Sequence, residues 1–365
     1  MSFERPNIRA MAGYVSGEQS EDPRTIKLNT NENPWPPAMC VQTALGQFDV
    51  AALRRYPPAT AAGLRAQIAD LHGLDTDQVI ATRGGDELLR LLITTFVEPG
   101  QAIGTTLPSY SLYSVLAEIH DSPLCEVALD RDYALPEELA RTFNAQGCAL
   151  NLIVNPHAPS GRLFGADELH DLAAACEGLV LIDEAYVDFV DPASGYDALP
   201  ILGDLNNVVI LRTLSKGYSL AGLRLGYGLG HASVIQPMLR KTRDSYNLDA
   251  ISQIIAQAAL SDQAYAQSTW KRVRSERTRL AAQLEELGFF VWPSETNFLL
   301  TQLPPDGPSA SDVYEYLKAA HILVRYFDSP GMLDKLRITI GTPEENAQLT
   351  AALNRLFRNE TEPTS

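Results

Sequence analysis

Residues 207–228 read NVVILRTLSKGYSLAGLRLGYG: an apolar run, a short polar loop and a second run, LRLGYG. Lys216 and Arg224 are the only charges between Thr213 and Gly228, in a chain whose formal net charge is −16. Continuously apolar runs are typical of strands that are buried on both faces of a sheet. The stretch therefore predicts a buried strand, followed by a loop that holds a lysine away from solvent.

The same alternation extends along the chain from about residue 60. Segments with helical periodicity separate short β-rich runs at 78–83, 101–106, 150–154 and 178–182. Helices that alternate with apolar strands predict an α/β fold, in which a mostly parallel sheet is flanked by helices.

We expect three parts. Residues 1–30 form an N-terminal arm, extended rather than helical, because the segment LNTNENPWPP at its end is rich in proline and asparagine. Residues 31–245 form the large α/β domain. Residues 246–365 form a smaller α+β C-terminal domain, entered through one long helical stretch.

Composition excludes several classes of function. The acidic net charge argues against nucleic acid as the main partner, since that class needs a basic face. No apolar run approaches the length that spans a membrane, and the first residues, MSFERPNIRAMAG, lack the apolar core of a secretory signal. The four cysteines and six histidines show no metal-ligand spacing. We therefore expect a cytoplasmic protein without a metal site.

Polar residues follow four of the expected strands. Asp183 follows 178–182, Lys216 follows 207–212, the turn NPHAPSG follows 150–154, and a Gly-Gly-Asp sequence follows 78–83 and begins a helix. Each feature alone is ordinary: a turn, a helix cap or a solvated lysine. Because ligands bind beyond the carboxyl ends of parallel strands, the four together predict one binding cleft.

The chemistry of these groups is complementary. A helix N-terminus and an arginine such as Arg224 bind phosphate. A lysine with a lowered pKa can attack an aldehyde, and a buried aspartate can hold a proton on a pyridine ring nitrogen. Phosphate, aldehyde and ring nitrogen are the three groups through which a protein can bind pyridoxal phosphate.

Further motifs carry a resemblance that runs nearly end to end. In order they are LNTNENPWPP, RYPP, TRGGDELL, LPSYSLY, NPHAPSG, LIDEAYVDF, TLSKGYSLAGLRLGY, NFLL, ILVR and LRITIGTPEEN. The chain resembles a fold-type-I (aspartate-aminotransferase-like) pyridoxal-phosphate aminotransferase, and most closely the histidinol-phosphate aminotransferase family. The resemblance implies a transamination in histidine biosynthesis, from histidinol phosphate to 2-oxoglutarate, that yields imidazole-acetol phosphate and glutamate.

The resemblance also implies roles for individual residues. Lys216 would bond the cofactor's aldehyde and act as the general base, Asp183 would hold the ring nitrogen, and Tyr186 would donate to the ring's phenolic oxygen. The other cofactor contacts that it implies are ring stacking by Tyr110, and phosphate binding by Thr213, Arg224 and the backbone of Gly85 and Asp86.

Tyr56, in RYPP, matches a tyrosine that reaches the phosphate from a second subunit, which implies a homodimer with a shared active site. Arg337 matches the arginine that grips the substrate's anionic end. Further candidates for the substrate are Arg325, Tyr14 and Asn33.

The loop NPHAPSG departs from the family pattern. The family commonly has an asparagine where this chain has Ala158, and that asparagine bonds the phenolic oxygen. The bond is lost, supplied by Asn155 or His157, or left to Tyr186 alone. We favour Asn155.

Four rival functions can be separated by sequence or assay. An aromatic-amino-acid aminotransferase or a threonine-phosphate decarboxylase would share the fold and most motifs. A cofactor-binding protein without catalysis is disfavoured by the intact Lys216, Asp183 and Tyr186. A nicotinamide-dependent dehydrogenase is excluded, because no GxGxxG follows any expected strand.

Overall fold

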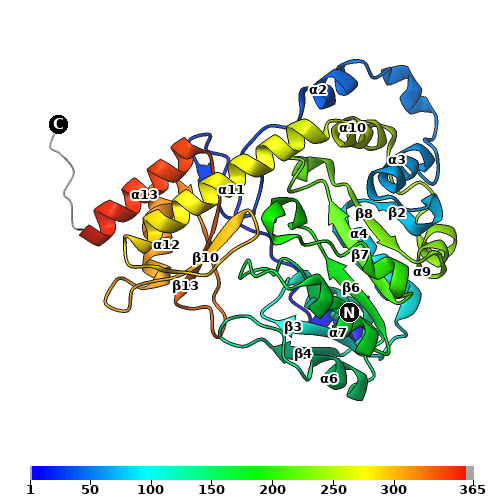
Figure 1. Ribbon diagram of the computed structural model, residues 1–365, viewed down its shortest axis with the longest axis horizontal. Helices are drawn as coiled ribbons and strands as arrows, with labels where there is room; N and C mark the ends of the chain where they lie inside the picture. The colour runs from blue at the N-terminus through cyan, green and yellow to red at the C-terminus, as the bar shows by residue number, and fades with distance from the viewer. Residues whose placement is uncertain (1, 359–365) are drawn as a thin grey trace.

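The computed structural model describes residues 2–358 of the chain. A large α/β part holds a seven-stranded sheet between helices, and a smaller part holds a four-stranded sheet. The long helix α11, Gln263–Glu285, runs from one part to the other (Figure 1).

The large sheet has the strand order β2-β8-β7-β6-β5-β3-β4. Only β8 is antiparallel to its neighbours, because the short loop after β7 returns the chain beside the strand it has just left. The expected mostly parallel sheet is therefore confirmed. Its strands are β2 Val79–Thr82, β3 Ile103–Leu107, β4 Leu124–Ala128, β5 Leu150–Val154, β6 Leu179–Asp183, β7 Val208–Thr213 and β8 Gly226–Gly230.

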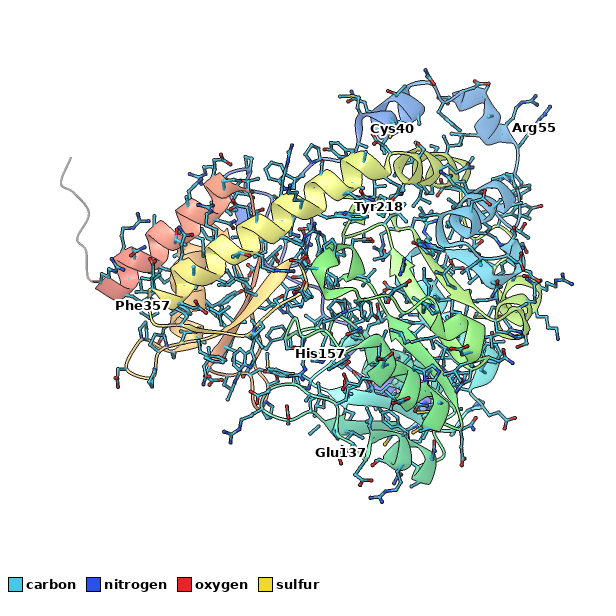
Figure 2. All side chains as sticks on the ribbon, in the orientation of Figure 1. Cys40, Arg55, Glu137, His157, Tyr218 and Phe357 are labelled. Atoms are coloured by element: carbon cyan, nitrogen blue, oxygen red, sulfur yellow. The ribbon has the colours of Figure 1, made fainter. Side chains whose placement is uncertain are left out.

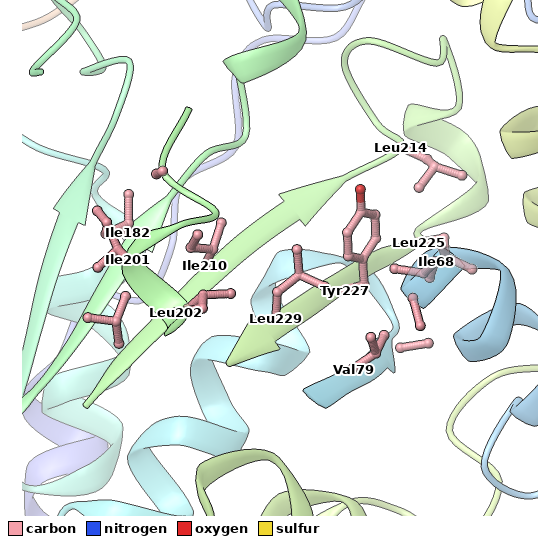
Figure 3. Packing of buried hydrophobic residues seen from close by; sticks show 14 of the residues in the cluster. Ile68, Val79, Ile182, Ile201, Leu202, Ile210, Leu214, Leu225, Tyr227 and Leu229 are labelled. Carbon is pink, nitrogen blue, oxygen red and sulfur yellow. The ribbon is translucent and has the colours of Figure 1, made fainter. Parts of the chain in front are cut away.

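Both faces of this sheet are buried. Successive residues along a strand enter different core clusters, Val209 on one face and Ile210 on the other. Figure 3 shows the second face, where Ile210 pairs with Leu229 of β8 beside Tyr227. The edge strand β4, which the sequence did not indicate, is only half-buried and therefore lacks a continuous apolar run.

Helices cover the two faces of the large sheet (Figure 1). They are α3 Ala62–His72, α4 Gly84–Phe96, α5 Leu112–His120, α6 Leu139–Ala145, α7 Ala166–Ala175, α8 Ile201–Asp204, α9 Ala232–Pro237 and α10 Ala250–Ser261. Helix α2, Met39–Gly46, packs mainly on α10. Short 3-10 turns at Val50–Arg54, Thr76–Gln78, Val187–Phe189, Pro192–Ser194 and Ala221–Leu223, and a π turn at Met238–Thr242, complete the large part.

The small part is an antiparallel sheet of order β12-β13-β10-β9 with helices packed on it. Beside this sheet, β1 of the arm pairs in parallel with β11, so the end of the arm is built into the small part. The elements are β1 Ile26–Lys27, β9 Phe290–Val291, β10 Phe298–Gln302, β11 Ile322–Leu323, β12 Arg325–Tyr326, β13 Lys335–Thr339, α12 Ala310–Ala319 and α13 Pro343–Arg358.

The expected long helix is two helices. The break lies at Asp262, whose side chain accepts a hydrogen bond from the backbone N–H of Tyr265 at 3.1 Å and so caps α11. Helix α10 packs against α2 and α3 of the large part, while α11 packs against the core of the small part. The domain boundary at residues 245 and 246 stays a prediction.

The sequence suggested an extended arm, but the arm is not wholly extended. Residues Pro6–Ala10 form a short helix, α1, with proline at the position where a helix tolerates it. Asn7 Nδ2 donates to the carbonyl of Glu118 at 2.7 Å, and Arg5 Nη2 donates to that of Ile119 at 2.6 Å. These contacts with the end of α5 stabilise a helix that proline-rich sequence alone does not indicate.

Within residues 2–358, no helix has both the length and the apolar character needed to cross a membrane.

Candidate active site

A cavity of about 470 Å3 lies at the carboxyl ends of the central strands. Gly85 and Asp86 after β2, Ala158 after β5, Asp183 at the end of β6 and Lys216 after β7 all line it. The four strand ends therefore meet at one cavity, as the sequence predicted.

Lys216 is held at the wall of this cavity by the arm. Its Nζ donates to the carbonyl of Thr30 at 2.8 Å and lies 5.9 Å from the centre of the Tyr186 ring. Burial, and then the positive charge of Arg337, lower the pKa of Lys216 to about 7. A substantial fraction of this amine is neutral at physiological pH, which is the form that acts as nucleophile or base.

Asp183 is a buried carboxylate with two fixed donors. Its Oδ2 accepts from the Tyr113 hydroxyl at 2.8 Å and its Oδ1 from the backbone N–H of Ala185 at 3.1 Å. Burial raises the pKa of Asp183 to about 6, although both donors favour the charged form. The carboxylate is therefore ionised at pH 7 and points in a fixed direction.

Sequence reasoning missed Tyr113, although the spacing of LPSYSLY places it one turn after Tyr110. The two rings pack edge to face, with centroids 5.6 Å apart. Tyr110 also lines the cavity and packs edge to face on Tyr14.

Tyr186 lines the cavity between the two parts of the molecule. Its ring packs edge to face on Phe298, with centroids 5.1 Å apart and an interplanar angle of 87°. Its hydroxyl accepts a hydrogen bond from Asn31 Nδ2 at 2.9 Å. Asn31 also lines the cavity and was missed, because the arm meets Tyr186 only in the folded chain.

At one end of the cavity, Arg224 lies against the first turn of α4. Its Nη2 is 3.2 Å from Asp86 Oδ2, and a Cβ on Gly84 would come within 2.8 Å of the same nitrogen. Gly84 has φ +74°, so glycine fits this position on both counts. The exposed N–H groups of α4 and the guanidinium together form a site suited to an anion.

The loop after β7 adds hydroxyl groups to this end. Thr213 and Ser215 line the cavity, and Thr213 Oγ1 accepts from the backbone N–H of Ser215 at 3.1 Å. Sequence reasoning missed Ser215, although it lies between Thr213 and Lys216 in the motif TLSK.

Two arginines line the opposite wall. Arg325 of β12 is the direct cross-strand partner of Arg337 of β13. Arg337 Nη2 donates to the carbonyl of Asn29 at 3.0 Å, while its buried Nε has no hydrogen-bond partner within residues 2–358. Like charges opposite each other on neighbouring strands repel, so this pair suits an anionic ligand.

The comparison with known proteins decides the family. Residues 23–353 match the family described as aminotransferase class I and II. The chain belongs to this family.

Similar proteins share most of its length. The aminotransferase is 42% identical to histidinol-phosphate aminotransferase 1 of Trichormus variabilis, over 98% of this chain and 99% of the relative. It is 40% identical to histidinol-phosphate aminotransferase of a Synechocystis species, over 96% and 97%. A crystal structure of histidinol-phosphate aminotransferase from Sinorhizobium meliloti, in complex with pyridoxal-5′-phosphate, superposes with a TM-score of 0.89 at 26% identity, covering 98% of both chains.

Asn155 does not take the place of the missing family asparagine. In this aminotransferase its Oδ1 accepts from the backbone N–H of Phe164 at 2.7 Å, and its Nδ2 donates to the Tyr196 hydroxyl at 2.8 Å. The side chain is fully buried and does not line the cavity. The expectation that Asn155 bonds the ring oxygen is therefore wrong, because both polar atoms are used elsewhere.

His157 is also engaged away from the cavity. The side chain, labelled in Figure 2, is fully buried. Its Nδ1 lies 2.7 Å from Ser160 Oγ and its Nε2 lies 2.9 Å from the carbonyl oxygen of Pro108. Burial lowers the pKa of His157 to about 4, so the ring is neutral. The loop presents only Ala158 and Pro159 to the cavity.

Two other expected residues lie outside the cavity. Asn33 Nδ2 donates to the carbonyl of Gly217 at 3.2 Å, and the asparagines of this motif that line the cavity are Asn29 and Asn31. Tyr56 is 80% exposed and stacks on Tyr246, with ring centroids 4.4 Å apart. Its proposed reach into a second subunit stays a prediction.

The described residues, 2 to 358, contain no group of three or more histidine, cysteine, aspartate or glutamate side chains that could hold a metal ion.

Proposed function

We propose that the chain is a pyridoxal-phosphate-dependent histidinol-phosphate aminotransferase that uses 2-oxoglutarate as the amino acceptor. The observation that carries this proposal is the composition of one cavity. A lysine with a pKa of about 7 and a buried carboxylate share the cavity with a cross-strand pair of arginines. Relatives that are 40 to 42% identical over nearly their whole length carry the name of this activity.

The residues present fit the cofactor. Asp183 would hold the ring nitrogen, Tyr110 would pack on the ring and Tyr186 would donate to its phenolic oxygen. The first turn of α4, with Gly84 packed against Arg224, is shaped for the phosphate. The residues that would bind this phosphate are Thr213, Ser215, Arg224 and the backbone of Gly85 and Asp86. When bound, pyridoxal phosphate supplies an aldehyde and an electron-withdrawing ring that stabilises negative charge at the substrate's Cα.

Lys216 would perform the proton transfer. Its amine is largely desolvated, and its pKa of about 7 matches a general base that works near neutral pH. The carbonyl of Thr30 orients Nζ at 2.8 Å in the resting protein. Asp183 would stay ionised beside the ring nitrogen and keep that nitrogen protonated, because Tyr113 and Ala185 both donate to the carboxylate.

The arginine pair favours a phosphorylated substrate. Neither Arg325 nor Arg337 forms an ion pair with a carboxylate within residues 2–358. Arg337 alone would serve a carboxylate as well as a phosphate, but a phosphate dianion would neutralise both guanidinium groups, whereas the single α-carboxylate of an aromatic amino acid would neutralise only one of them. Threonine phosphate also carries a phosphate, so the decarboxylase remains the second candidate.

One titration tests this proposal. The purified protein is loaded with pyridoxal phosphate, and its visible absorbance is followed while amines are added singly. We expect histidinol phosphate to deplete the visible band promptly and to yield imidazole-acetol phosphate, with little response to phenylalanine or phosphothreonine. Release of CO2 from phosphothreonine would instead identify the decarboxylase. A protein that develops no visible band would contradict the cofactor assignment.

We also propose a homodimer in which Tyr56 serves the second subunit's cavity. A large, exposed tyrosine outside its own cavity supports this assignment.

A further inference from the structure

The loop after β5 offers the cavity no side-chain hydrogen-bond donor. Ala158 presents only a methyl group, and the polar atoms of Asn155 and His157 are bonded elsewhere. Of the residues assigned above to the ring's phenolic oxygen, Tyr186 alone remains. The direction in which its hydroxyl proton points therefore decides whether that oxygen receives a hydrogen bond.

Asn31 constrains that direction. Its Nδ2 donates to Tyr186 Oη at 2.9 Å, so Asn31 occupies a lone pair of the hydroxyl and does not accept the tyrosine's proton. The proton of Tyr186 is left for an acceptor on the cavity side. If the amide were reversed, Tyr186 would donate to Asn31 and would have no proton to offer.

Thr339 favours one orientation of the amide, because a reversed amide would leave the threonine's proton without an acceptor. Thr339 Oγ1 accepts from the backbone N–H of Asn31 at 3.0 Å and donates its own proton to Asn31 Oδ1 at 3.1 Å. The oxygen of the amide is thereby held toward β13 and the nitrogen toward Tyr186. The hydrogen bonds form a directed series from Thr339 through Asn31 to Tyr186.

The backbone of the arm holds this series in place. Asn31 is 1% exposed and has φ +56°, a conformation that asparagine tolerates better than most residues. Asn297 Nδ2 donates to the carbonyl of Asn31 at 2.9 Å, and the N–H of Thr339 donates to the carbonyl of Leu28 at 2.9 Å. The arm is therefore fastened to the small sheet on both sides of the amide.

We propose that Asn31 and Thr339 are positioning residues that aim the Tyr186 hydroxyl proton into the cavity. This inference rests on the proposed function, since the acceptor there is the phenolic oxygen of pyridoxal phosphate. The series makes up for the donor that Ala158 lacks.

Burial keeps the Tyr186 hydroxyl protonated, so that it can donate. Burial raises the pKa of Tyr186, while Arg337 and the hydrogen bond from Asn31 act in the opposite direction. The other titratable groups close to it are Lys216, Asp183, Tyr14, Tyr110 and Tyr113. A tyrosine that stays protonated but is polarised by a donor is a stronger hydrogen-bond donor to an anionic oxygen.

The test uses the loaded protein without substrate. A donor to the phenolic oxygen shares that oxygen's negative charge, so the oxygen stabilises the proton on the bond between Lys216 and the cofactor less strongly. Losing the donor therefore raises the pH at which the visible band changes. We expect Asn31→Asp, which accepts the tyrosine's proton and so removes the donor, to raise that midpoint by about one pH unit, the scale of one hydrogen bond to a charged group. Asn31→Ala leaves the proton on Tyr186 but no longer aims it, and should raise the midpoint by less.

Three further variants complete the design. Asn151→Ala is the matched control, because Asn151 is equally buried but donates only to the carbonyl of Leu179, outside the cavity. Ala158→Asn, added to Asn31→Ala, supplies a donor from the loop and should lower the midpoint again. Thr339→Val removes only the hydroxyl behind Asn31, and should raise the midpoint by less than Asn31→Ala. It still tests the inference if Asn31→Ala folds poorly.

The outcomes separate this inference from the proposed function. A midpoint that rises in the Asn31 and Thr339 variants, but not in Asn151→Ala, supports the inference. A visible band whose midpoint is the same in all these variants as in the parent overturns the inference alone. A parent protein that forms no visible band overturns the proposed function and the inference together.

Discussion

The Tyr113 hydroxyl donates to Asp183 Oδ2 at 2.8 Å, in the interior of the large part. Each residue of this pair would leave an unsatisfied polar group if the other were removed. The hydrogen bond favours the ionised carboxylate, which is the form that the proposed chemistry requires.

Replacing Tyr113 with Phe should therefore raise the pKa of Asp183 above its present value of about 6. In the cofactor-free protein, the folded pKa already lies above the ordinary value of about 4, so stability falls as pH rises from about 4 to about 6. The variant should extend that fall to higher pH. Denaturant unfolding across pH 4 to 8 measures the effect, and identical pH profiles for the two proteins would contradict it.

Lys216 should govern how pH controls cofactor loading. Its pKa of about 7 lies well below the ordinary value, so the rate at which the cofactor-free protein gains the visible band should rise with pH through about 7 and then level. Lys216→Ala should still bind the cofactor but show no turnover. Lys241→Ala, at an exposed position, is the matched control. Turnover like that of the parent in Lys216→Ala would refute the assignment.

Much of the site follows from local sequence. Apolar runs predict buried strands, and the rule for parallel sheets places Asp183 and Lys216 at one edge. Tyr113 was predictable as well, since it lies three positions beyond Tyr110 in the same motif.

The rest depends on contacts between distant segments. Asn31 meets Thr339 across 308 positions, and no periodicity in the arm indicates that meeting. Asn155 was assigned wrongly for the same reason, because Tyr196, 41 positions away, takes its amide. A polar residue in a recognised loop shows where it lies along the chain but not which partner it bonds.

Arg337 should bind the substrate's anionic group with both charge and geometry. Arg337→Ala should raise KM for histidinol phosphate about 100-fold with a smaller change in kcat, since charge-assisted hydrogen bonds to one ligand are lost. Arg337→Lys should recover only part of this, because an ammonium group cannot form the planar two-point contact. Steady-state kinetics measures both constants. An unchanged KM in Arg337→Ala would remove this residue from the substrate site.

A mixing experiment should show whether the active site is shared. Tyr56→Ala lacks the tyrosine offered to the partner, and Lys216→Ala lacks the reactive amine, so each homodimer should be impaired. A mixed dimer would hold one complete site, built from Lys216 of one subunit and Tyr56 of the other. Unfolding and refolding the two variants together at equal concentration should therefore restore activity, at about a quarter of all sites.

Separate refolding of each variant is the control for this experiment. Activity that equals the mean of the two separately refolded proteins would show that Tyr56 acts within its own subunit or not at all. The exposed stack of Tyr56 on Tyr246 makes the first of these unfavourable, because the ring lies outside its own cavity. A gain on mixing would therefore identify the segment around Tyr56 as part of the interface between subunits.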